Sequence, residues 1–377
     1  MFTNIPTPYR VPLFEKWASQ SGVELEIVFL AETEATRSWR GLLDDVKFEF
    51  KVLGSPWYWR RFGRKSLKLN SGVWSAIRRF QPDVIITAGY DEIAYWKIAL
   101  YCKLTGTARV NWSGTTLHTG RGRRFIGRKL KTIFARSADA SVTYGSLAAR
   151  YLESLGAEPD SIVTGVNTTD VTKLAEDVET TRANSSFGIE RDKYPLFLIS
   201  VVGRLLRFKG VDDILMALAE IDSPDIGMLV VGDGPDQSRL EELVENNSIR
   251  NVFFVGFAEG EKLVEQYALT DLAVFASHSD VWGMVVNESL AAGIYTLCST
   301  GAGAHADLIV PGIDGDLFEP GDINEIKHLI ESAFSRAEWL RESRTKISED
   351  AVELTDPRRH IQALMRSTEI AIEKSKQ

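Results

Sequence analysis

The stretch Leu196-Phe197-Leu198-Ile199-Ser200-Val201-Val202-Gly203-Arg204-Leu205-Leu206-Arg207-Phe208-Lys209-Gly210 decides how this chain folds. Its first seven residues are apolar apart from one serine, which is the pattern of a strand covered on both faces of a parallel sheet. A glycine-containing turn follows, and a helical pattern begins at Val211. A strand that passes through such a turn into a helix is the repeating unit of an α/β fold.

Short apolar strands alternate with longer helical segments on both sides of this stretch. The further predicted strands are 25–30, 84–88, 108–112 and 140–144 in the first half, and 227–231, 251–255, 272–276 and 295–299 in the second. Only Met1 and Phe2 precede the loop Thr3-Asn4-Ile5-Pro6, so the expected opening strand is short. The pattern predicts an α/β protein of two Rossmann-like domains with doubly wound parallel sheets.

The chain length of 377 residues fits two domains. We expect the first domain at 1–170 and the second at 190–356, because the polar segment between them contains no strand pattern. Pro357 stands at a plausible helix start, and the helical segment 357–377 is expected to pack back on the first domain.

The composition is that of a globular protein, with 44% hydrophobic and 25% charged residues. The chain has no apolar run of membrane-spanning length and no signal-peptide pattern at its beginning, and its two cysteines are too few for a disulfide framework. We therefore expect a cytoplasmic protein with two buried thiols.

The charge is divided unevenly along the chain. Residues 1–165 contain 24 Lys and Arg against 15 Asp and Glu, whereas the remaining residues contain 20 against 37. Either the first half meets an anionic partner or the two halves simply have differently solvated faces. Nucleic acid is disfavoured as that partner because no DNA- or RNA-binding motif accompanies the basic residues.

The turn after the strand 196–202 has the features of a phosphate site. Gly203 opens it, and Arg204, Arg207 and Lys209 place three cations within six residues before a helix. Backbone N–H groups at such a turn, together with the positive end of the helix dipole, attract phosphate. Arg204 and Lys209 can neutralise a diphosphate without a metal ion; the alternative is an exposed basic turn.

Two acids, Asp280 and Glu288, stand eight residues apart after the strand 272–276. Asp280 is in the loop beyond the strand's carboxyl end, where open α/β sheets bind ligands. Glu288 lies in an apolar helical segment, so we expect its carboxylate to need hydrogen-bond donors such as sugar hydroxyls. The Gly232-Asp233-Gly234-Pro235 turn and the glycine-rich loop 299–305 are weaker signals. His305 is interpreted as a loop histidine and Asp314-Gly315-Asp316 as a turn.

Several motifs in one order resemble family 4 (group 1) retaining glycosyltransferases of the GT-B fold. They are Val202-Gly203-Arg204 with Lys209-Gly210, Val231-Gly232-Asp233-Gly234-Pro235, Phe254-Val255-Gly256, Tyr267-Ala268-Leu269-Thr270-Asp271, Asp280 to Glu288, Ala292-Gly293 and Pro311-Gly312-Ile313-Asp314-Gly315. The resemblance covers about 195–325. It implies two Rossmann-like domains facing across a cleft, with a UDP- or GDP-linked sugar donor bound by the second domain.

The resemblance also implies roles for residues. Arg204 and Lys209 would hold the donor diphosphate, Glu288 the ribose, and Asp280 the transferred sugar, at a position where the family has the longer Glu. The implied donor site comprises Gly203, Arg204, Lys209, Gly232, Asp280, Trp282, Gly283, Met284 and Glu288. The implied catalytic groups are Arg204, Lys209, Asp280 and His118. No cofactor and no metal ion are expected, and the anomeric configuration would be retained.

The first half resembles the acceptor domains of enzymes that build polysaccharides, most clearly at residues 4–14. His118, in the loop after the strand 108–112, is the acceptor-side candidate; a loop histidine bonded to backbone is the alternative. Trp57 to Lys65 mixes aromatic and basic residues, and Arg121 to Arg136 contains seven cations and no acid. Both suit an anionic membrane surface and a glycan or lipid-linked acceptor, although an acceptor-phosphate site or a basic face is the alternative.

Three functions fit these observations. The first is a retaining transferase that adds a sugar during cell-surface polysaccharide or lipid-linked oligosaccharide assembly. The second is another GT-B nucleotide-sugar enzyme, such as an epimerase, which would need no separate acceptor. The third is a catalytically silent nucleotide-sugar-binding protein.

Overall fold

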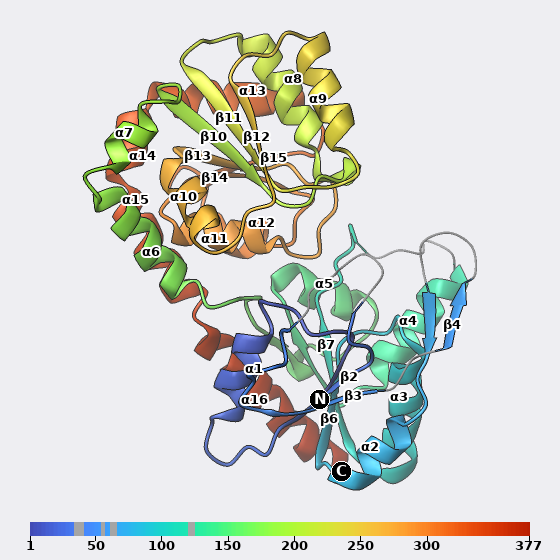
Figure 1. Cartoon of the computed structure of the whole chain (residues 1–377). Helices are drawn as coiled ribbons and strands as arrows, with labels where there is room; N and C mark the ends of the chain where they lie inside the picture. Colours follow the sequence, from blue (N-terminus) through green and yellow to red (C-terminus); the bar gives the residue numbers. More distant parts are fainter. Residues whose placement is uncertain (34–40, 54–56, 61–65, 120–124) are drawn as a thin grey trace. The chain divides into compact units, whose positions relative to one another are not determined.

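The computed structural model describes residues 1–33, 41–53, 57–60, 66–119 and 125–377. Their contacts divide the chain into two compact units (Figure 1). The first comprises Met1–Thr169 and Pro357–Gln377, and the second Asp170–Asp356. None of the helices in these described ranges is long and apolar enough to cross a membrane.

The first unit contains a seven-stranded parallel sheet in the order β3-β2-β1-β6-β7-β8-β9. Its strands are β1 (Phe2–Thr3), β2 (Glu26–Phe29), β3 (Glu49–Val52), β6 (Val84–Thr87), β7 (Ala108–Ser113), β8 (Ala140–Thr143) and β9 (Ile162–Thr164). A separate hairpin consists of β4 (Trp57–Arg60) and β5 (Ser66–Leu69). The opening strand β1 has only two residues, yet it pairs with β2 on one side and β6 on the other.

Helices cover both faces of this sheet. They are α1 (Val11–Ala18), α2 (Val73–Phe80), α3 (Ile93–Thr105), α4 (Phe125–Arg136), α5 (Ser146–Ser154) and α16 (Pro357–Ser375). Ile27 and Phe29 of β2 join the core beneath α1 and α16, whereas Val28 joins the core on the other face. This two-sided burial is why the strands read as continuous apolar runs.

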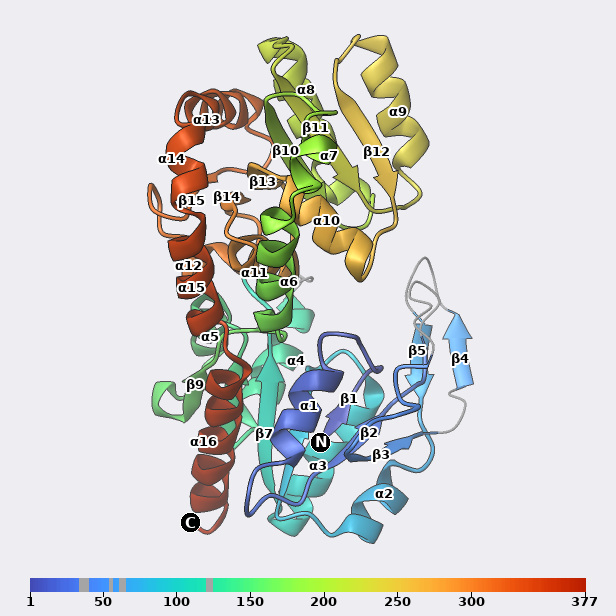
Figure 2. The same ribbon diagram turned by 60° about the vertical axis from the view of Figure 1, so that its left-hand side comes forward.

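The helix α16 is a wall of the first unit, although the whole second unit precedes it in the sequence. It packs on β7, β8 and β9 and touches α1 (Figure 2). Ile361, Leu364 and Ala371 bury their side chains in the core on that face. The structure therefore has the expected helix, which starts at Pro357 and packs on the first unit.

The second unit contains a six-stranded parallel sheet in the order β12-β11-β10-β13-β14-β15. Its strands are β10 (Phe197–Val202), β11 (Ile226–Val231), β12 (Val252–Gly256), β13 (Leu272–Phe275), β14 (Tyr295–Ser299) and β15 (Gly315–Phe318). Counted along the chain this is the order 3-2-1-4-5-6 of a Rossmann fold, and the strand order reverses between β10 and β13.

Two helical layers enclose the second sheet. One contains α8 (Val211–Ile221), α9 (Gln237–Asn246) and α13 (Ile323–Ser335), and the other contains α6 (Thr172–Ala183), α10 (Glu261–Leu269), α11 (Met284–Ala291) and α15 (Arg344–Leu354). The short helices are α7 (Phe187–Arg191), α12 (His305–Leu308) and α14 (Ala337–Glu342). Because α6 packs on α10, α11 and α15, the second unit starts at Asp170, earlier than residue 190.

The prediction of two doubly wound α/β domains is confirmed, and so is the burial of both thiols, Cys102 and Cys298. Besides the two strands of the β4–β5 hairpin, three strands were not predicted. Two of them, β3 and β9, are edge strands whose residues are partly or fully exposed. The third, β15, has only four residues and starts with a glycine. Short or exposed strands lack the apolar run on which the prediction depended.

Candidate functional site

Most of the residues predicted to bind the donor gather at the carboxyl edge of the second sheet. The loop after β10 carries Gly203, Arg204 and Lys209, and the loop after β13 carries Asp280. Although these two strands are far apart in sequence, they pair directly in the sheet. The loops therefore meet where the strand order reverses, which is where open α/β sheets bind ligands.

Glycine allows the loops after β10 and β11 to touch through their backbones. Gly232 has a φ of +134°, and a Cβ atom built there would lie 2.0 Å from the carbonyl oxygen of Gly203. A Cβ at Gly234 would lie 2.3 Å from the carbonyl oxygen of Leu205. Larger residues at these two positions would push the loop after β10 away. The loop after β11 therefore packs directly against the loop that carries Arg204 and Lys209.

Lys209 and Asp280 form an ion pair, with Nζ 2.6 Å from Oδ2. The Lys209 ammonium also lies 5.0 Å from the ring centre of Phe275. Both charged side chains are only partly exposed, at 20% and 24%. This pair joins two residues that the sequence had assigned to phosphate and sugar separately, and a bound donor would have to share or replace it.

Arg204 is exposed and forms no ion pair with any described residue. Together with Gly203 and Lys209 it lines one small cavity next to Phe275. Its fork of donors is thus available to an anionic group, unlike the ammonium of Lys209, which already has a carboxylate partner.

Backbone hydrogen bonds fix the two loops to each other. The carbonyl oxygen of Phe208 accepts from the backbone N–H of His278 at 2.8 Å and from the hydroxyl of Ser277 at 3.3 Å. The ring of His278 lies 2.5 Å from a carboxylate oxygen of Asp213, at the start of α8. These supporting contacts were not predicted, because neither Phe208 nor His278 belongs to a recognisable binding pattern.

The carboxylate of Glu288, on α11, accepts a hydrogen bond of 2.8 Å from the hydroxyl of Tyr267. Burial raises the pKa of Glu288, and the Tyr267 bond opposes that shift. The sequence predicted that a glutamate in so apolar a helix would need hydrogen-bond donors. Tyr267 supplies one of them, which leaves the other carboxylate oxygen, Oε1, to interact with a ligand.

Trp282, Gly283 and Met284 lie at the beginning of α11, and both N–H groups of Trp282 have partners within the protein. Its backbone N–H already contacts Asp280 Oδ1 at 3.3 Å, and its buried indole N–H donates to Asn287 at 2.8 Å. Trp282 therefore braces the loop. Gly283 has a φ of +104°, and a Cβ atom there would lie 2.7 Å from the Phe275 ring.

The remaining loop candidates have internal partners. His305 Nδ1 lies 2.7 Å from the carbonyl oxygen of Ala302, as expected of a loop histidine. Asp314 accepts from the backbone N–H of Val310 at 2.8 Å, and Asp316 contacts Arg336 at 3.1 Å. Both carboxylates thus stabilise a turn and its neighbouring helix. No group of three or more His, Cys, Asp or Glu in the described ranges could hold a metal ion.

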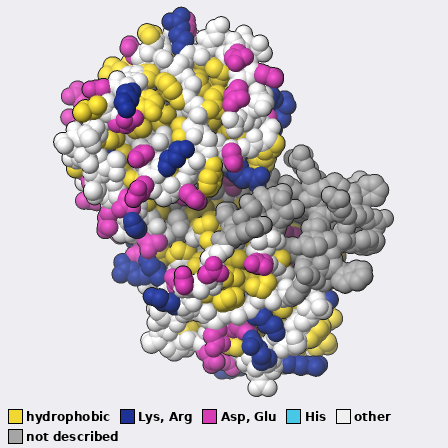
Figure 3. Space-filling view, in the orientation of Figure 1, with side chains coloured by type: hydrophobic (Ala, Val, Ile, Leu, Met, Phe, Trp, Pro, Cys, Tyr) yellow, Lys and Arg dark blue, Asp and Glu magenta, His cyan; other side chains and the backbone are white. Residues whose placement is uncertain are grey.

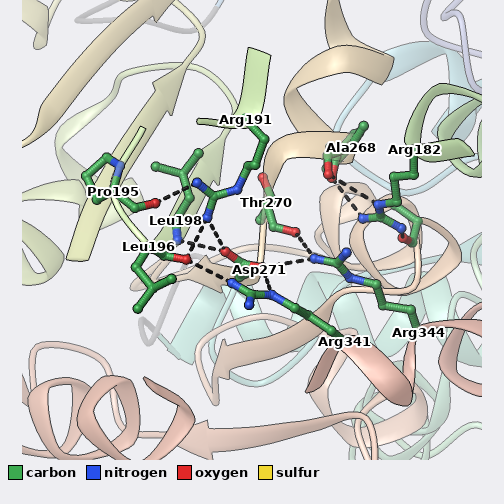
Figure 4. A network of polar contacts seen from close by, with 12 residues as sticks. Arg182, Arg191, Pro195, Leu196, Leu198, Ala268, Thr270, Asp271, Arg341 and Arg344 are labelled. Carbon is green, nitrogen blue, oxygen red and sulfur yellow. Dashed lines mark hydrogen bonds and ion pairs between the residues drawn. The ribbon is translucent and has the colours of Figure 1, made fainter. Parts of the chain in front are cut away.

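A network of arginines around Asp271 lies on the opposite edge of the second sheet, before β13 (Figure 4). Asp271 accepts from Arg191 at 2.7 Å, from Arg341 at 2.9 Å and from Arg344 at 3.0 Å. Arg191 and Arg341 also donate to the carbonyl oxygen of Leu196. This cluster ties α7, α14 and α15 to the sheet and is a structural feature of the unit.

In the first unit, His118 lies on the loop after β7 and is exposed. Its acceptor-side role stays a prediction. Of the two basic stretches, residues 61–65 and 121–124 lie outside the described ranges. Over the face of the second unit drawn in Figure 3, acidic and basic side chains are interspersed, with no single patch of one sign.

Solved structures with the same architecture define the class of fold. The Anabaena protein Alr3699/HepE, solved with UDP, superimposes with a TM-score of 0.76 over 97% of this chain and all of its own, at 16% identity. A lipopolysaccharide outer core galactosyltransferase, WaaB, superimposes with a TM-score of 0.68 over 95% of this chain and 94% of its own, at 16% identity. The chain has the GT-B fold of glycosyltransferases.

Residues 184–353, which make up most of the second unit, match the family described as Glycosyl transferases group 1. The N-acetyl-alpha-D-glucosaminyl L-malate synthase of Bacillus anthracis is 27% identical over 53% of this chain and 57% of its own length. A GDP-mannose-dependent alpha-mannosyltransferase of Corynebacterium glutamicum is 32% identical over 38% of this chain. The match spans 31% of that mannosyltransferase.

Proposed function

We propose that this protein is a retaining glycosyltransferase that moves a sugar from a UDP- or GDP-linked donor to a hydroxyl of a glycan or lipid-linked acceptor in cell-surface polysaccharide assembly. The observation that carries the proposal is the convergence of Arg204, Lys209, Asp280 and Glu288 on one edge of the second sheet. Two similar proteins support a nucleoside-diphosphate sugar as the donor, since one was solved with UDP-glucose and the other is a GDP-mannose-dependent mannosyltransferase.

The charges at this edge suit the departure of a nucleoside diphosphate. Negative charge grows on the leaving diphosphate in the transition state, and fixed positive groups lower the barrier by stabilising it. Arg204 can offer two parallel N–H groups, and Lys209 a point charge. In this proposal these cations do what a divalent ion does elsewhere, so chelation of metal ions with EDTA should leave the activity unchanged.

The carboxylates would position the rest of the donor. Glu288, held at one oxygen by Tyr267, would accept from the ribose hydroxyls. Asp280 would exchange part of its contact with Lys209 for a sugar hydroxyl. His118 would act on the acceptor side. The acceptor hydroxyl would attack the anomeric carbon on the face from which the diphosphate leaves, and the diphosphate would take the proton.

Nucleotide binding tests the donor site directly. A ligand at one hundred times its dissociation constant stabilises the folded state by about 2.7 kcal/mol, which a thermal melt detects. We expect UDP or GDP, and one of their sugars, to raise the melting temperature. Arg204→Ala and Lys209→Ala should each weaken nucleotide binding about tenfold or more, because a charge-assisted hydrogen bond is lost.

A matched control is Lys346→Ala on α15, which removes an exposed cation that pairs with Asp350 in the next helical turn. It should leave nucleotide affinity unchanged. Unchanged affinity in the Arg204 and Lys209 variants would contradict the site. Conversion of the donor without any acceptor would favour the epimerase alternative, and binding without turnover on any acceptor would favour the silent binding protein.

We further propose that the protein works at the cytoplasmic face of a membrane. On α4, Leu130 and Ile133 are 49% and 58% exposed, and Arg128 and Arg136 are exposed beside them. Exposed apolar residues next to cations favour the headgroup zone of anionic lipid.

Flotation with vesicles tests this location. The protein should float with vesicles containing phosphatidylglycerol and remain unbound with phosphatidylcholine alone. Leu130→Gln with Ile133→Gln should weaken the association while nucleotide binding stays intact. Equal behaviour of the two vesicle types would contradict the proposal.

A further inference from the structure

Arg10, in the first unit, is a charged side chain buried without a charged partner. Only 7% of it is exposed, and its Nη1 atom is buried without a hydrogen bond. No carboxylate among the described residues forms an ion pair with it. The uncharged hydroxyl of Tyr144 forms a hydrogen bond with Arg10, and Asp91, the carboxylate whose charge also acts on that hydroxyl, is exposed.

Aromatic rings hold the Arg10 guanidinium in place. Its Cζ atom lies 3.9 Å from the ring centre of Trp112 and 4.8 Å from that of Tyr144. Rings attract a cation and fix its plane, but they do not neutralise its charge. Oxygen atoms of an anion would complete the coordination that the rings leave open.

Further polar groups next to Arg10 are also unpaired. The hydroxyl of Thr7 and the indole N–H of Trp112 are buried without hydrogen-bond partners among the described residues. His360, of α16, lies 5.3 Å from the Trp112 ring. Burial, with a contribution from Arg10, lowers the pKa of His360 to about 3, so this ring is neutral and does not compete for an anion.

The position of Arg10 in the sheet is that of a binding site. The loop that carries it follows β1, while Trp112 and Tyr144 stand at the carboxyl ends of β7 and β8. In the first sheet the strand order reverses between β1 and β6. The corresponding place in the second sheet carries Arg204 and Lys209, so each unit has cations at its switch point.

We propose that Arg10 binds an oxyanion group, a carboxylate or a phosphate, of the acceptor, and so selects acidic acceptors. That the bound anion belongs to an acceptor rests on the proposed transferase function. The anion site itself is argued from residues of the first unit alone. Phosphate would come from a phosphorylated or lipid-linked acceptor, and carboxylate from a sugar acid. The planar, stacked guanidinium suits either group through two parallel hydrogen bonds.

The test uses the full chain carrying Arg204→Gln and Lys209→Gln, which removes the donor-site cations that would otherwise bind the probes. Inorganic phosphate, glucuronate and, as a neutral control, glucose are titrated at constant ionic strength by calorimetry. We expect at least one of the two anions to bind and glucose not to bind. Adding Arg10→Met should lower the association constant about tenfold or more.

A matched control is Arg78→Gln, the loss of an exposed cation on α2 of the same unit. It should leave anion binding unchanged. The single variant Arg10→Met, measured without ligand, should have a melting temperature at least as high as that of the unaltered protein. The reason is that the substitution removes an uncompensated buried charge. Arg10→Lys keeps the charge without the planar fork and should bind less tightly than Arg10.

The outcomes separate the possibilities. Binding of phosphate alone identifies a phosphorylated acceptor, binding of glucuronate alone a sugar acid, and binding of both a general oxyanion site. Binding of neither anion, equal affinity in the Arg10→Met protein, or a lower melting temperature of Arg10→Met would overturn the proposal. Failure of UDP and GDP to bind the unaltered protein would contradict the donor site while leaving this result intact.

Discussion

The arginines around Asp271 and the single Arg10 have different kinds of partner in the folded protein. Arg191, Arg341 and Arg344 all meet the carboxylate of Asp271 and donate to backbone carbonyl oxygens as well (Figure 4). Arg10 meets aromatic rings and an uncharged histidine. The first arrangement is complete in the protein alone, whereas the second lacks its anion.

The magnitudes explain why this difference matters. Removing a charge from water costs several kcal/mol even after relaxation, and a desolvated cation over an aromatic ring regains about 2 kcal/mol. The Asp271 cluster recovers the remainder through ion pairs and hydrogen bonds. At Arg10 part of the cost stays uncompensated until a ligand arrives, which is how binding sites commonly differ from structural clusters.

Of the substitutions that test this comparison, Asp271→Asn should lower the free energy of unfolding the most. The side chain keeps its shape, but three arginines lose their common counter-charge, and breaking a buried pair typically costs about 3–5 kcal/mol. Urea unfolding of the two proteins at pH 7 measures the difference in free energy. A loss below about 1 kcal/mol would show that the carbonyl oxygens alone suffice for these arginines.

Repeating the urea unfolding at lower pH tests the contribution of the ionised Asp271 carboxylate. Burial raises the pKa of Asp271, but the hydrogen bond from Arg341 and the surrounding arginine charges outweigh it, so the net shift is downward. A depressed pKa means that this stabilisation is present above about pH 4 and is lost as the pH falls through the lower pKa of the folded state. Asp350→Asn, in an exposed pair, is the control and should change stability by less than about 1 kcal/mol.

His360 should give the next largest effect, through pH. Its pKa is about 3 in the folded protein, from burial and from Arg10, against an ordinary 6.5. The unfolded chain therefore takes up a proton that the folded chain refuses, so stability is full above pH 6.5 and falls as the pH drops toward 3. The loss between pH 7 and pH 5 should be about 2 kcal/mol.

The control for this pH effect is His360→Phe, which keeps a ring against Trp112 without a titrating nitrogen. Urea unfolding at pH 7, 6 and 5 should show a shallower decline in that variant than in the unaltered protein. Parallel declines would mean that His360 is protonated in the folded state and that water or an anion reaches the surroundings of Arg10.

Arg341→Met should have the smallest effect of the three. It removes one arginine of the Asp271 cluster, with bonds of 2.9 Å to Asp271 and 2.8 Å to the carbonyl oxygen of Leu196. Two arginines remain, and Arg341 is partly open to solvent, so about 1 kcal/mol of unfolding free energy should be lost. A loss as large as that of Asp271→Asn would show that the cluster acts as a single unit.

The sequence predicted the strands that are buried on both faces, because burial imposes an apolar run that can be read directly. It also predicted that Arg204, Lys209 and Asp280 would share one edge, since parallel strands end on the same side of a sheet. The pairing of Lys209 with Asp280 and of Tyr267 with Glu288 could not be predicted. Such contacts depend on side-chain directions across 71 and 21 residues of chain, which no local pattern specifies.

The environment of Arg10 also could not be predicted from the sequence. In the sequence it is one residue of an ordinary polar turn, resembling the first loop of acceptor domains. Its lack of a carboxylate partner emerges only when β7, β8 and α16 bring Trp112, Tyr144 and His360 around it. A missing partner is a property of the packed unit, so no pattern of residue types could have indicated it.

Placing α16 in the first unit also has a consequence for biosynthesis. Domains generally fold as they emerge from the ribosome, with the N-terminal one first. Here the sheet of Met1–Thr169 stays uncovered on the α16 face until Pro357–Ser375 has been made, after the entire second unit. The half that is translated first is thus the half completed last, and ribosome-bound chains stalled before residue 357 should expose that apolar face to chaperones.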